Sequence, residues 1–144
     1  MTDSGTKAQG SCLCGAVRFT VELPALFCAH CHCSMCRRNH GAGFVTWFAV
    51  PPDRFAMDAG RDRVVRYRSS EHGTRSFCGV CGSSLLCESS EHPDRIDVVL
   101  ANMDDPIGRE PEFHVWFSDR VPWVSTGDSL PRLGGDSGLE PLDD

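Results

Sequence analysis

The stretch CAHCHCSMCRRNHG, residues 28–41, places four cysteines and three histidines within fourteen residues. Cysteine thiolates and histidine imidazoles are ligands that zinc prefers, so this density predicts a metal site. Two smaller clusters lie elsewhere in the chain, Cys12 with Cys14 and Cys78 with Cys81. The chain has nine cysteines in all, an odd number that excludes a scheme in which every cysteine forms a disulfide within the chain.

The composition limits the class of protein. The chain has 144 residues, of which 40% are hydrophobic and 24% charged, as expected for a globular domain of ordinary size. Its net charge of −6 and the lack of a basic stripe argue against nucleic acid as a partner. No apolar run reaches the roughly 20 residues of a membrane span, and no secretory signal opens the chain. We therefore expect a cytoplasmic protein with reduced cysteines.

The chain divides by composition into three parts. Residues 1–9 are polar and predict a flexible leader. For residues 10–133 we expect a single zinc domain. From Ser125 onward Gly, Asp, Ser and Pro become frequent, and residues 134–144 predict a polar, poorly ordered tail.

Hydrophobic patterning predicts a mainly β fold. Residues 16–22 alternate strictly between apolar and polar side chains, as in a half-buried strand. Further extended segments are predicted at residues 26–33, 43–50, 63–69, 74–78, 83–89 and 95–103. Ser34 as N-cap and Gly41 after the last turn predict one short helix between them. We expect small antiparallel sheets with one or two short helices.

Two of the cysteine clusters predict one closed zinc site. Cys12 and Cys14 lie two residues apart, so an extended chain directs both side chains to the same face. Cys78 and Cys81 form a C-x-x-C-G turn, in which Gly82 permits the tight backbone that brings two thiolates together. The four sulfurs complete a tetrahedron, which indicates a structural zinc. A metal ion that links the two ends of such a long loop stabilises the folded chain.

The remaining cluster predicts a second zinc of a different kind. We call Cys31, Cys33 and Cys36 the cysteine triplet. Alternation places the first two sulfurs on one face, and Cys36 returns to them over the start of the short helix. Three sulfurs leave one corner of a zinc tetrahedron open, which distinguishes catalytic from structural zinc.

Cys28 provides an alternative to the open site. With the triplet it would make a complete set of four thiolates, for zinc or even for an iron–sulfur cluster. On an extended chain Cys28 shares its face with His30 and His32, which argues against this arrangement. A bend at Ala29 would reverse the argument, so the sequence leaves both arrangements open.

Four segments, SCLCGAVRF, HCHCSMCRRNHGAGFVTWFAVP, FCGVCGSSL and HVWFSDRVPWV, follow one another in an order that resembles the glutathione-dependent formaldehyde-activating enzyme family. The same domain occurs in centromere protein V. The resemblance extends from about Gly10 to Leu133. It implies a β-tent fold, in which small antiparallel sheets are joined by a zinc with four cysteine ligands. It also implies a second zinc held by the triplet, in agreement with the two sites predicted from spacing.

The resemblance further implies carbon–sulfur lyase chemistry of the S-(hydroxymethyl)glutathione synthase type. The partners would be a small thiol such as glutathione and a small aldehyde such as formaldehyde. A zinc-bound substrate thiol would lose its proton near neutral pH and could then attack the aldehyde. The sequence makes no prediction of the oligomeric state.

Several side chains near the triplet are candidates for roles in this chemistry. His32 and His40 are the nearest groups that could donate a proton to the developing alkoxide. Arg37 and Arg38 could hold the carboxylates of glutathione, or they could simply form a solvated face of the helix. The aromatic residues that would line a pocket or pack in the core are Trp47, Phe48, Trp116 and Trp123. The histidines without metal-like spacing are His72, His92 and His114.

Two other functions remain open at this point. The domain could be a non-catalytic, zinc-stabilised binding module whose second site is closed by Cys28 or a histidine. It could also be a thiol-based metal or redox sensor, in which the triplet oxidises reversibly with Cys28 as a resolving partner.

Overall fold

The computed structural model describes residues 6–142 and confirms the mainly β fold class. Among these residues there is one α-helix, α1 (Ser34–His40). The short 3-10 turns are η1 (Pro52–Arg54), η2 (Arg61–Arg63), η3 (Leu100–Asn102) and η4 (Phe117–Asp119). No helix in this part of the chain has the length and apolar character needed to cross a membrane.

The described residues form two compact units. Unit 1 consists of the chain up to Leu26 together with Phe48–Arg109. Unit 2 consists of Phe27–Trp47 together with the chain from Glu110 onward. Each unit is assembled from two separate stretches of sequence. The single domain expected over residues 10–133 stays a prediction.

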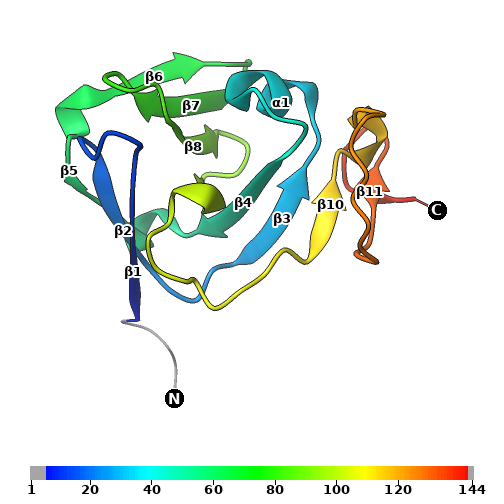
Figure 1. The fold of residues 1–144 in the computed structure, drawn as a ribbon, viewed down its shortest axis with the longest axis horizontal. Coiled ribbons are helices and arrows are strands. Elements are labelled where there is room, and N and C mark those ends of the chain that lie inside the picture. Colours follow the sequence, from blue (N-terminus) through cyan, green and yellow to red (C-terminus); the bar gives the residue numbers. More distant parts are fainter. Residues whose placement is uncertain (1–5, 143–144) are drawn as a thin grey trace. The chain divides into compact units, whose positions relative to one another are not determined.

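A three-stranded sheet lies in unit 1, with β2 (Arg18–Glu22) between β1 (Lys7–Ser11) and β5 (Phe55–Ala59). Both pairings are antiparallel, and Figure 1 shows β1 and β2 side by side in blue. The predicted alternation is present, since Phe19 is buried and Arg18 is exposed. The ring of Phe19 stacks on a residue of the neighbouring strand, Phe55, at 5.4 Å between centroids.

Strand β1 lies within the predicted leader. Its residues pair with β2 from Lys7 to Ser11, so residues 7–9 belong to the sheet. Gln9 also donates its backbone N–H to the Asp105 carboxylate at 2.8 Å. No strand was predicted here, because polar residues on an edge strand do not produce a strong hydrophobic alternation. Residues 1–5 of the predicted leader lie outside the described residues.

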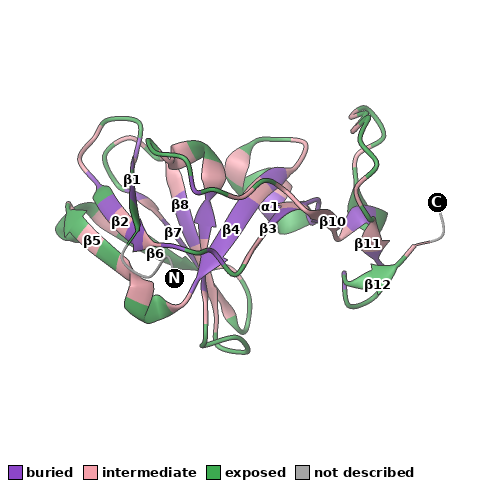
Figure 2. Cartoon of the chain, turned by 90° about the horizontal axis from the view of Figure 1, so that it is seen from below, coloured by how far each residue is buried: buried purple, intermediate pink, exposed green. Residues whose placement is uncertain are grey.

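The second group of strands in unit 1 has the order β9-β8-β7-β6, and each strand pairs antiparallel with its neighbour. The strands are β6 (Val64–Arg68), β7 (Gly73–Cys78), β8 (Ser84–Ser89) and β9 (Ile96–Val99). Each coincides with a segment predicted from the sequence. Figure 2 shows the difference in burial between exposed β6 and the more buried β8.

Unit 2 is built on a parallel strand pair, β3 (Phe27–Cys31) and β10 (Phe113–Val115). The register places His114 opposite His30 and Val115 opposite Cys31. The chain then leaves β3, forms α1 and enters β4 (Val45–Val50), whose first residues belong to this unit. This parallel pair brings the segment around His114 to the cysteine-rich stretch.

The helix cap differs from its prediction by one residue. The N-cap is Cys33, not Ser34, and the Cys33 sulfur accepts the backbone N–H of Cys36 at 3.2 Å. At the other end Gly41 adopts φ 63°, as predicted for a residue that follows the last turn. A member of the cysteine triplet therefore fixes the start of α1.

The predicted tail, residues 134–144, contains regular structure within its described part, which ends at Leu142. Strands β11 (Leu133–Gly134) and β12 (Glu140–Pro141) pair antiparallel. Trp116 donates its backbone N–H to the Gly138 carbonyl, and a Cβ at Gly138 would meet the Trp116 ring. Polar composition did not reveal this order because backbone hydrogen bonds and one glycine contact maintain it. Residues 143–144 lie outside the described residues.

We expect Gly60→Ala to destabilise unit 1 much more than Gly108→Ala. Both glycines have positive φ, 79° and 71°, so each substitution costs about 1–2 kcal/mol in backbone strain. A Cβ at Gly60 would also meet the Ala16 carbonyl, whereas nothing lies within 4 Å at Gly108. Overpacking adds about 1–3 kcal/mol. Chemical denaturation of the metal-loaded proteins measures the difference, and equal losses of stability would contradict the backbone contact.

Candidate functional site

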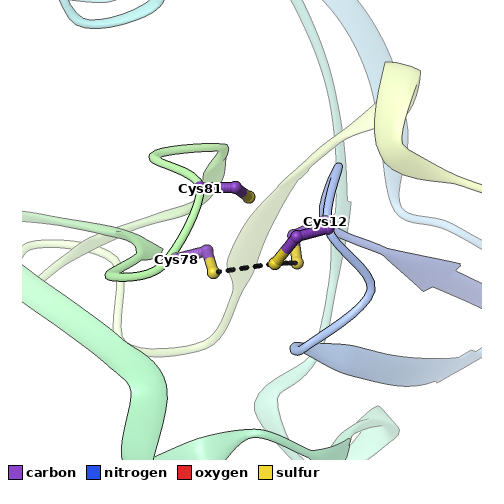
Figure 3. Close-up of side chains that lie close together, drawn as sticks. Cys12, Cys78 and Cys81 are labelled. Carbon is purple, nitrogen blue, oxygen red and sulfur yellow. Dashed lines mark hydrogen bonds between the residues drawn. The ribbon is translucent and has the colours of Figure 1, made fainter.

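The first candidate metal site is the four-cysteine cluster of Cys12, Cys14, Cys78 and Cys81, which lies entirely in unit 1. All four sulfurs lie within 4.8 Å of one another. The Cys14 sulfur is 3.6 Å from that of Cys12 and 3.9 Å from that of Cys78. In Figure 3 the loop before β2 carries Cys12, Cys78 ends β7, and the turn that follows β7 carries Cys81. The structure thus brings together the set that spacing predicted.

Both loops direct backbone N–H groups at sulfur. Val17 donates to the Cys12 sulfur at 3.3 Å, and Val80 donates to the Cys78 sulfur at 3.4 Å. Gly82 has φ 82° and donates its N–H to the Cys78 carbonyl at 2.8 Å, which closes the tight turn. Hydrogen bonds of this kind favour a negatively charged sulfur. The loops therefore suit thiolates that bind a cation.

The pKa values of the crowded thiols move in opposite directions. The Ser83 hydroxyl, 3.2 Å away, holds the pKa of Cys81 down to about 5. The Ala16 amide would lower the pKa of Cys14, but burial and the neighbouring thiols outweigh it and raise that pKa to about 11. Without a cation, the four sulfurs cannot all be negative at once. Since none of them is in a disulfide, the cluster fits a divalent ion such as zinc.

The second candidate site is the cysteine triplet, which lies entirely in unit 2. The triplet sulfurs also lie within 4.8 Å of one another, with 3.5 Å between those of Cys31 and Cys36. Cys31 ends β3, Cys33 caps α1 and Cys36 lies in the first turn of the helix. All three residues are buried. The short strand–cap–turn sequence is sufficient to bring the three sulfurs together.

The triplet supplies three ligands, one fewer than a zinc tetrahedron takes. Within residues 6–142 no other Cys, His, Asp or Glu atom joins the three sulfurs at the same distance. The thiols of Cys33 and Cys36, together with burial, strongly raise the pKa of Cys31. The metal-free triplet therefore retains protons that a bound cation would displace.

The structure does not bring Cys28 to the triplet. Cys28 lies in β3 and is fully buried, and its backbone N–H donates to the Glu112 carboxylate at 3.0 Å. The strand continues through Ala29 without the bend that would turn the Cys28 side chain toward Cys31. The geometry therefore favours the open arrangement of three sulfurs over a closed set of four.

His32, a predicted proton donor, lies at the centre of a buried aromatic group. Its ring stacks on Phe44 at 5.1 Å and meets the edge of Phe117 at 4.9 Å. Its Nε2 is 2.9 Å from Nδ1 of His114. Burial, with a smaller contribution from His114, lowers the pKa of His32 to about 4. His32 is therefore neutral near pH 7.

His114 lies in contact with His32, although the sequence analysis assigned it no role. Its side chain is fully buried, and its Nε2 lies 3.1 Å from both carboxylate oxygens of Asp128. We call His32, His114 and Asp128 the histidine chain. Burial would raise the pKa of Asp128, but the hydrogen bonds from His114 and the Leu130 amide outweigh it and lower that pKa. A histidine within an apolar strand was the available signal, but its distance from His32 in the sequence concealed the contact.

The other predicted residues near the triplet occupy different surroundings. His40 lies with its ring edge against Trp47 at 5.3 Å between centroids. Arg37 is half-buried and donates from Nε to the His32 carbonyl at 3.2 Å, whereas Arg38 is exposed. The helix therefore holds Arg37 against the triplet segment and leaves Arg38 accessible.

Two further arginines lie close to the histidine chain. The guanidinium of Arg120 lies over the Phe117 ring at 4.4 Å, and that of Arg132 lies over it at 5.0 Å. Among the predicted aromatic residues, Trp47 and Phe48 are buried and Trp123 is 71% exposed. Trp116 packs against Gly138. Core packing is therefore the role of Trp47 and Phe48.

We expect metal analysis of purified variants to separate the two sites. Wild-type protein should contain two zinc ions, and Cys12→Ser and Cys33→Ser should each lose one of them, because each removes a sulfur from a different site. Cys28→Ser should retain both ions. Mass spectrometry under non-denaturing conditions measures these contents. A zinc ion lost from Cys28→Ser alone would contradict the three-sulfur arrangement.

We expect acid to release metal from the triplet before the four-cysteine cluster. A thiol with a raised pKa, such as Cys31, takes up a proton at higher pH and displaces the cation sooner. The four-cysteine cluster also contains a thiol with a raised pKa, Cys14 at about 11, but this cluster holds the cation with four sulfurs instead of three. Its Cys81, with a pKa of about 5, remains a thiolate over most of the same range. A zinc indicator dye measures the release of zinc from pH 8 to pH 4. Cys12→Ser reports on the triplet, and Cys33→Ser reports on the four-cysteine cluster. Release in the opposite order would contradict the assignment.

Comparison with known proteins places the chain in a family. A family model described as glutathione-dependent formaldehyde-activating enzyme matches residues 7–119. A Halomonas elongata protein with the provisional name of such an enzyme is 29% identical over 124 residues, 81% of this chain and 78% of the relative. A Talaromyces marneffei protein with the same provisional name is 27% identical over 120 residues, 81% of this chain and 64% of the relative.

Two further similarities agree with this result. A Schizosaccharomyces pombe protein named as an uncharacterized lyase is 32% identical over 79 residues, 54% of each protein. The crystal structure of a Rhodobacter sphaeroides protein matches with a TM-score of 0.59 and 25% identity, covering 72% of this chain and 97% of that one. Because the family model matches most of the sequence, the chain belongs to the glutathione-dependent formaldehyde-activating enzyme family.

Proposed function

We propose that this chain is a zinc-dependent carbon–sulfur lyase that joins a small thiol to a small aldehyde, or separates them. The observation that carries this proposal is the buried triplet of three sulfurs, one fewer than a zinc tetrahedron takes. Glutathione and formaldehyde are the proposed substrates, since the family and two relatives are named for them. The product would be S-(hydroxymethyl)glutathione.

The two candidate metal sites would have different roles. Zinc at Cys31, Cys33 and Cys36 would favour the thiolate form of a thiol near neutral pH. In the four-cysteine cluster the protein supplies every corner of a tetrahedron, which suits a structural ion. That ion would hold the loop before β2 against the loop after β7 within unit 1.

The reaction itself moves one proton and forms one bond. The sulfur of the thiol forms a bond to the carbonyl carbon, the carbonyl π electrons move to oxygen, and the proton that leaves sulfur ends on that oxygen. Formaldehyde is intrinsically reactive, so a site that holds both reactants together gains much of its rate from proximity. The triplet residues are themselves buried, which would limit the access of competing water.

Of the two histidines predicted to handle the proton, His32 has the stronger support. It follows one triplet residue directly, precedes another, and is neutral near pH 7, so it can accept a hydrogen bond. His40 lies at the end of α1 with its ring against Trp47. We therefore assign the proton-handling role to His32 and retain His40 as the second candidate.

Arg37 and Arg38 are proposed to hold the carboxylates of glutathione. A guanidinium matches a carboxylate with two parallel hydrogen bonds, which a thiol without carboxylates cannot use. Arg38 is exposed on the helix that carries Cys36, and this position suits contact with the part of the substrate outside the buried triplet.

We expect metal-loaded protein to accelerate the formation of S-(hydroxymethyl)glutathione above the spontaneous rate. Exchange spectroscopy by NMR, with glutathione and formaldehyde at equilibrium, measures both rates in one sample. Cys33→Ser should eliminate the excess rate by removing a triplet sulfur, whereas Cys87→Ser, outside both sites, should retain it. Wild-type protein with two zinc ions and no excess rate would favour the binding-module alternative.

We expect Arg38→Gln to raise the KM for glutathione about fivefold, corresponding to about 1 kcal/mol for an exposed ion pair. The same variant should leave the KM for 2-mercaptoethanol unchanged, because this thiol has no carboxylate. Arg61→Gln, an exposed arginine in unit 1, is the matched control. An equal change for both thiols would contradict a carboxylate contact.

A further inference from the structure

The histidine chain is continuous from an accessible carboxylate to a buried nitrogen. Asp128 has a side chain that is 32% exposed, whereas His114 is 0% and His32 is 1% exposed. At the inner end, Nδ1 of His32 is buried and has no hydrogen-bond partner among the described residues. A buried polar atom without a partner costs free energy, so this nitrogen requires an explanation.

When both rings are neutral, the carboxylate determines where their hydrogens lie. An ionised carboxylate only accepts hydrogen bonds, so Nε2 of His114 must donate to Asp128. In a neutral ring the other nitrogen, Nδ1, is then an acceptor. Only one hydrogen fits in the 2.9 Å between this nitrogen and Nε2 of His32, so His32 must donate. Nδ1 of neutral His32 is consequently left with a lone pair.

Backbone hydrogen bonds fix the parts of the chain that carry these side chains. His32 donates its backbone N–H to the Val115 carbonyl at 3.0 Å, and His114 donates its own to the Pro131 carbonyl at 2.9 Å. Asp128 accepts the Leu130 amide at 3.0 Å, which holds its carboxylate in a tight turn. All of these contacts lie within unit 2. The two rings therefore cannot exchange partners without disruption of the strand pair.

We propose that His114 and Asp128 are positioning residues that hold His32 as its Nε2–H tautomer and so present the Nδ1 lone pair to the thiol substrate or its aldehyde adduct. The proposal rests on the proposed function, because it assigns a ligand to a nitrogen in the triplet segment. The substrate group would be a hydrogen-bond donor, either the S–H of the thiol or the hydroxyl of the adduct. The other tautomer would present an N–H and could accept from neither.

Nitrogen NMR of the ring atoms reads this tautomer directly. The chemical shift of a ring nitrogen depends strongly on whether it carries a hydrogen, so 15N-histidine labelling of the metal-loaded protein distinguishes the two forms. His32→Gln identifies the His32 signals. We expect Nδ1 of His32 without hydrogen at pH 7 and a shift of its resonance when glutathione is added. Hydrogen on Nδ1 of His32, or no response to glutathione, would overturn the proposal.

Asp128→Asn tests the origin of the tautomer with almost no change in shape. The amide can donate to Nε2 of His114, which would reverse both hydrogen bonds and place hydrogen on Nδ1 of His32. We expect this inversion in the spectrum, with kcat at least about tenfold lower and metal content unchanged. Asp136→Asn, an exposed acid in the same unit, is the matched control and should change neither property.

The outcomes separate this proposal from the proposed function. Wild-type protein without an excess rate would contradict the enzyme assignment, while the spectrum would still determine the tautomer and its response to glutathione. An active enzyme in which Asp128→Asn alters neither the tautomer nor kcat would overturn the role of the histidine chain alone. A tautomer that inverts without loss of kcat would overturn it as well.

Discussion

The structure depends on the enforced proximity of sulfur atoms. Seven cysteines gather in two groups, each with its sulfurs within 4.8 Å, and none of them is in a disulfide. Like charges at such distances cannot coexist without a cation. Burial and the neighbouring thiols raise the pKa of Cys14 to about 11, while the Ser83 hydroxyl lowers that of Cys81 to about 5. Metal binding would exchange protons for an ion and thereby contribute to the stability of the folded chain.

The sequence predicted these sulfur groups because their geometry is local. Cys33 needs only a strand before it and a helical turn after it to meet Cys36, and the C-x-x-C-G turn needs only Gly82 in a left-handed conformation. The strands of unit 1 were predictable for the same reason, since an alternating pattern such as that around Phe19 is contained within each segment. The cap at Cys33 was misplaced because sulfur is an unusual capping acceptor.

The remaining features depend on contacts between distant segments. Nothing near His114 in the sequence shows that β10 will pair in parallel with β3, or that Asp128 will return to the same place. The described part of the tail is likewise fixed by partners such as Gly138 and Trp116, not by its own hydrophobicity. Composition reports how much apolar surface a segment can bury, but it does not report which backbone groups it will meet.

The side chains proposed to take part in the reaction lie in one unit, and the proposed structural metal site lies in the other. The triplet, the histidine chain and the arginines over Phe117 all belong to unit 2, whereas the four-cysteine cluster belongs to unit 1. The family model ends at residue 119, before Asp128. If the tautomer of His32 depends on this carboxylate, the functional unit extends beyond the segment that identifies the family.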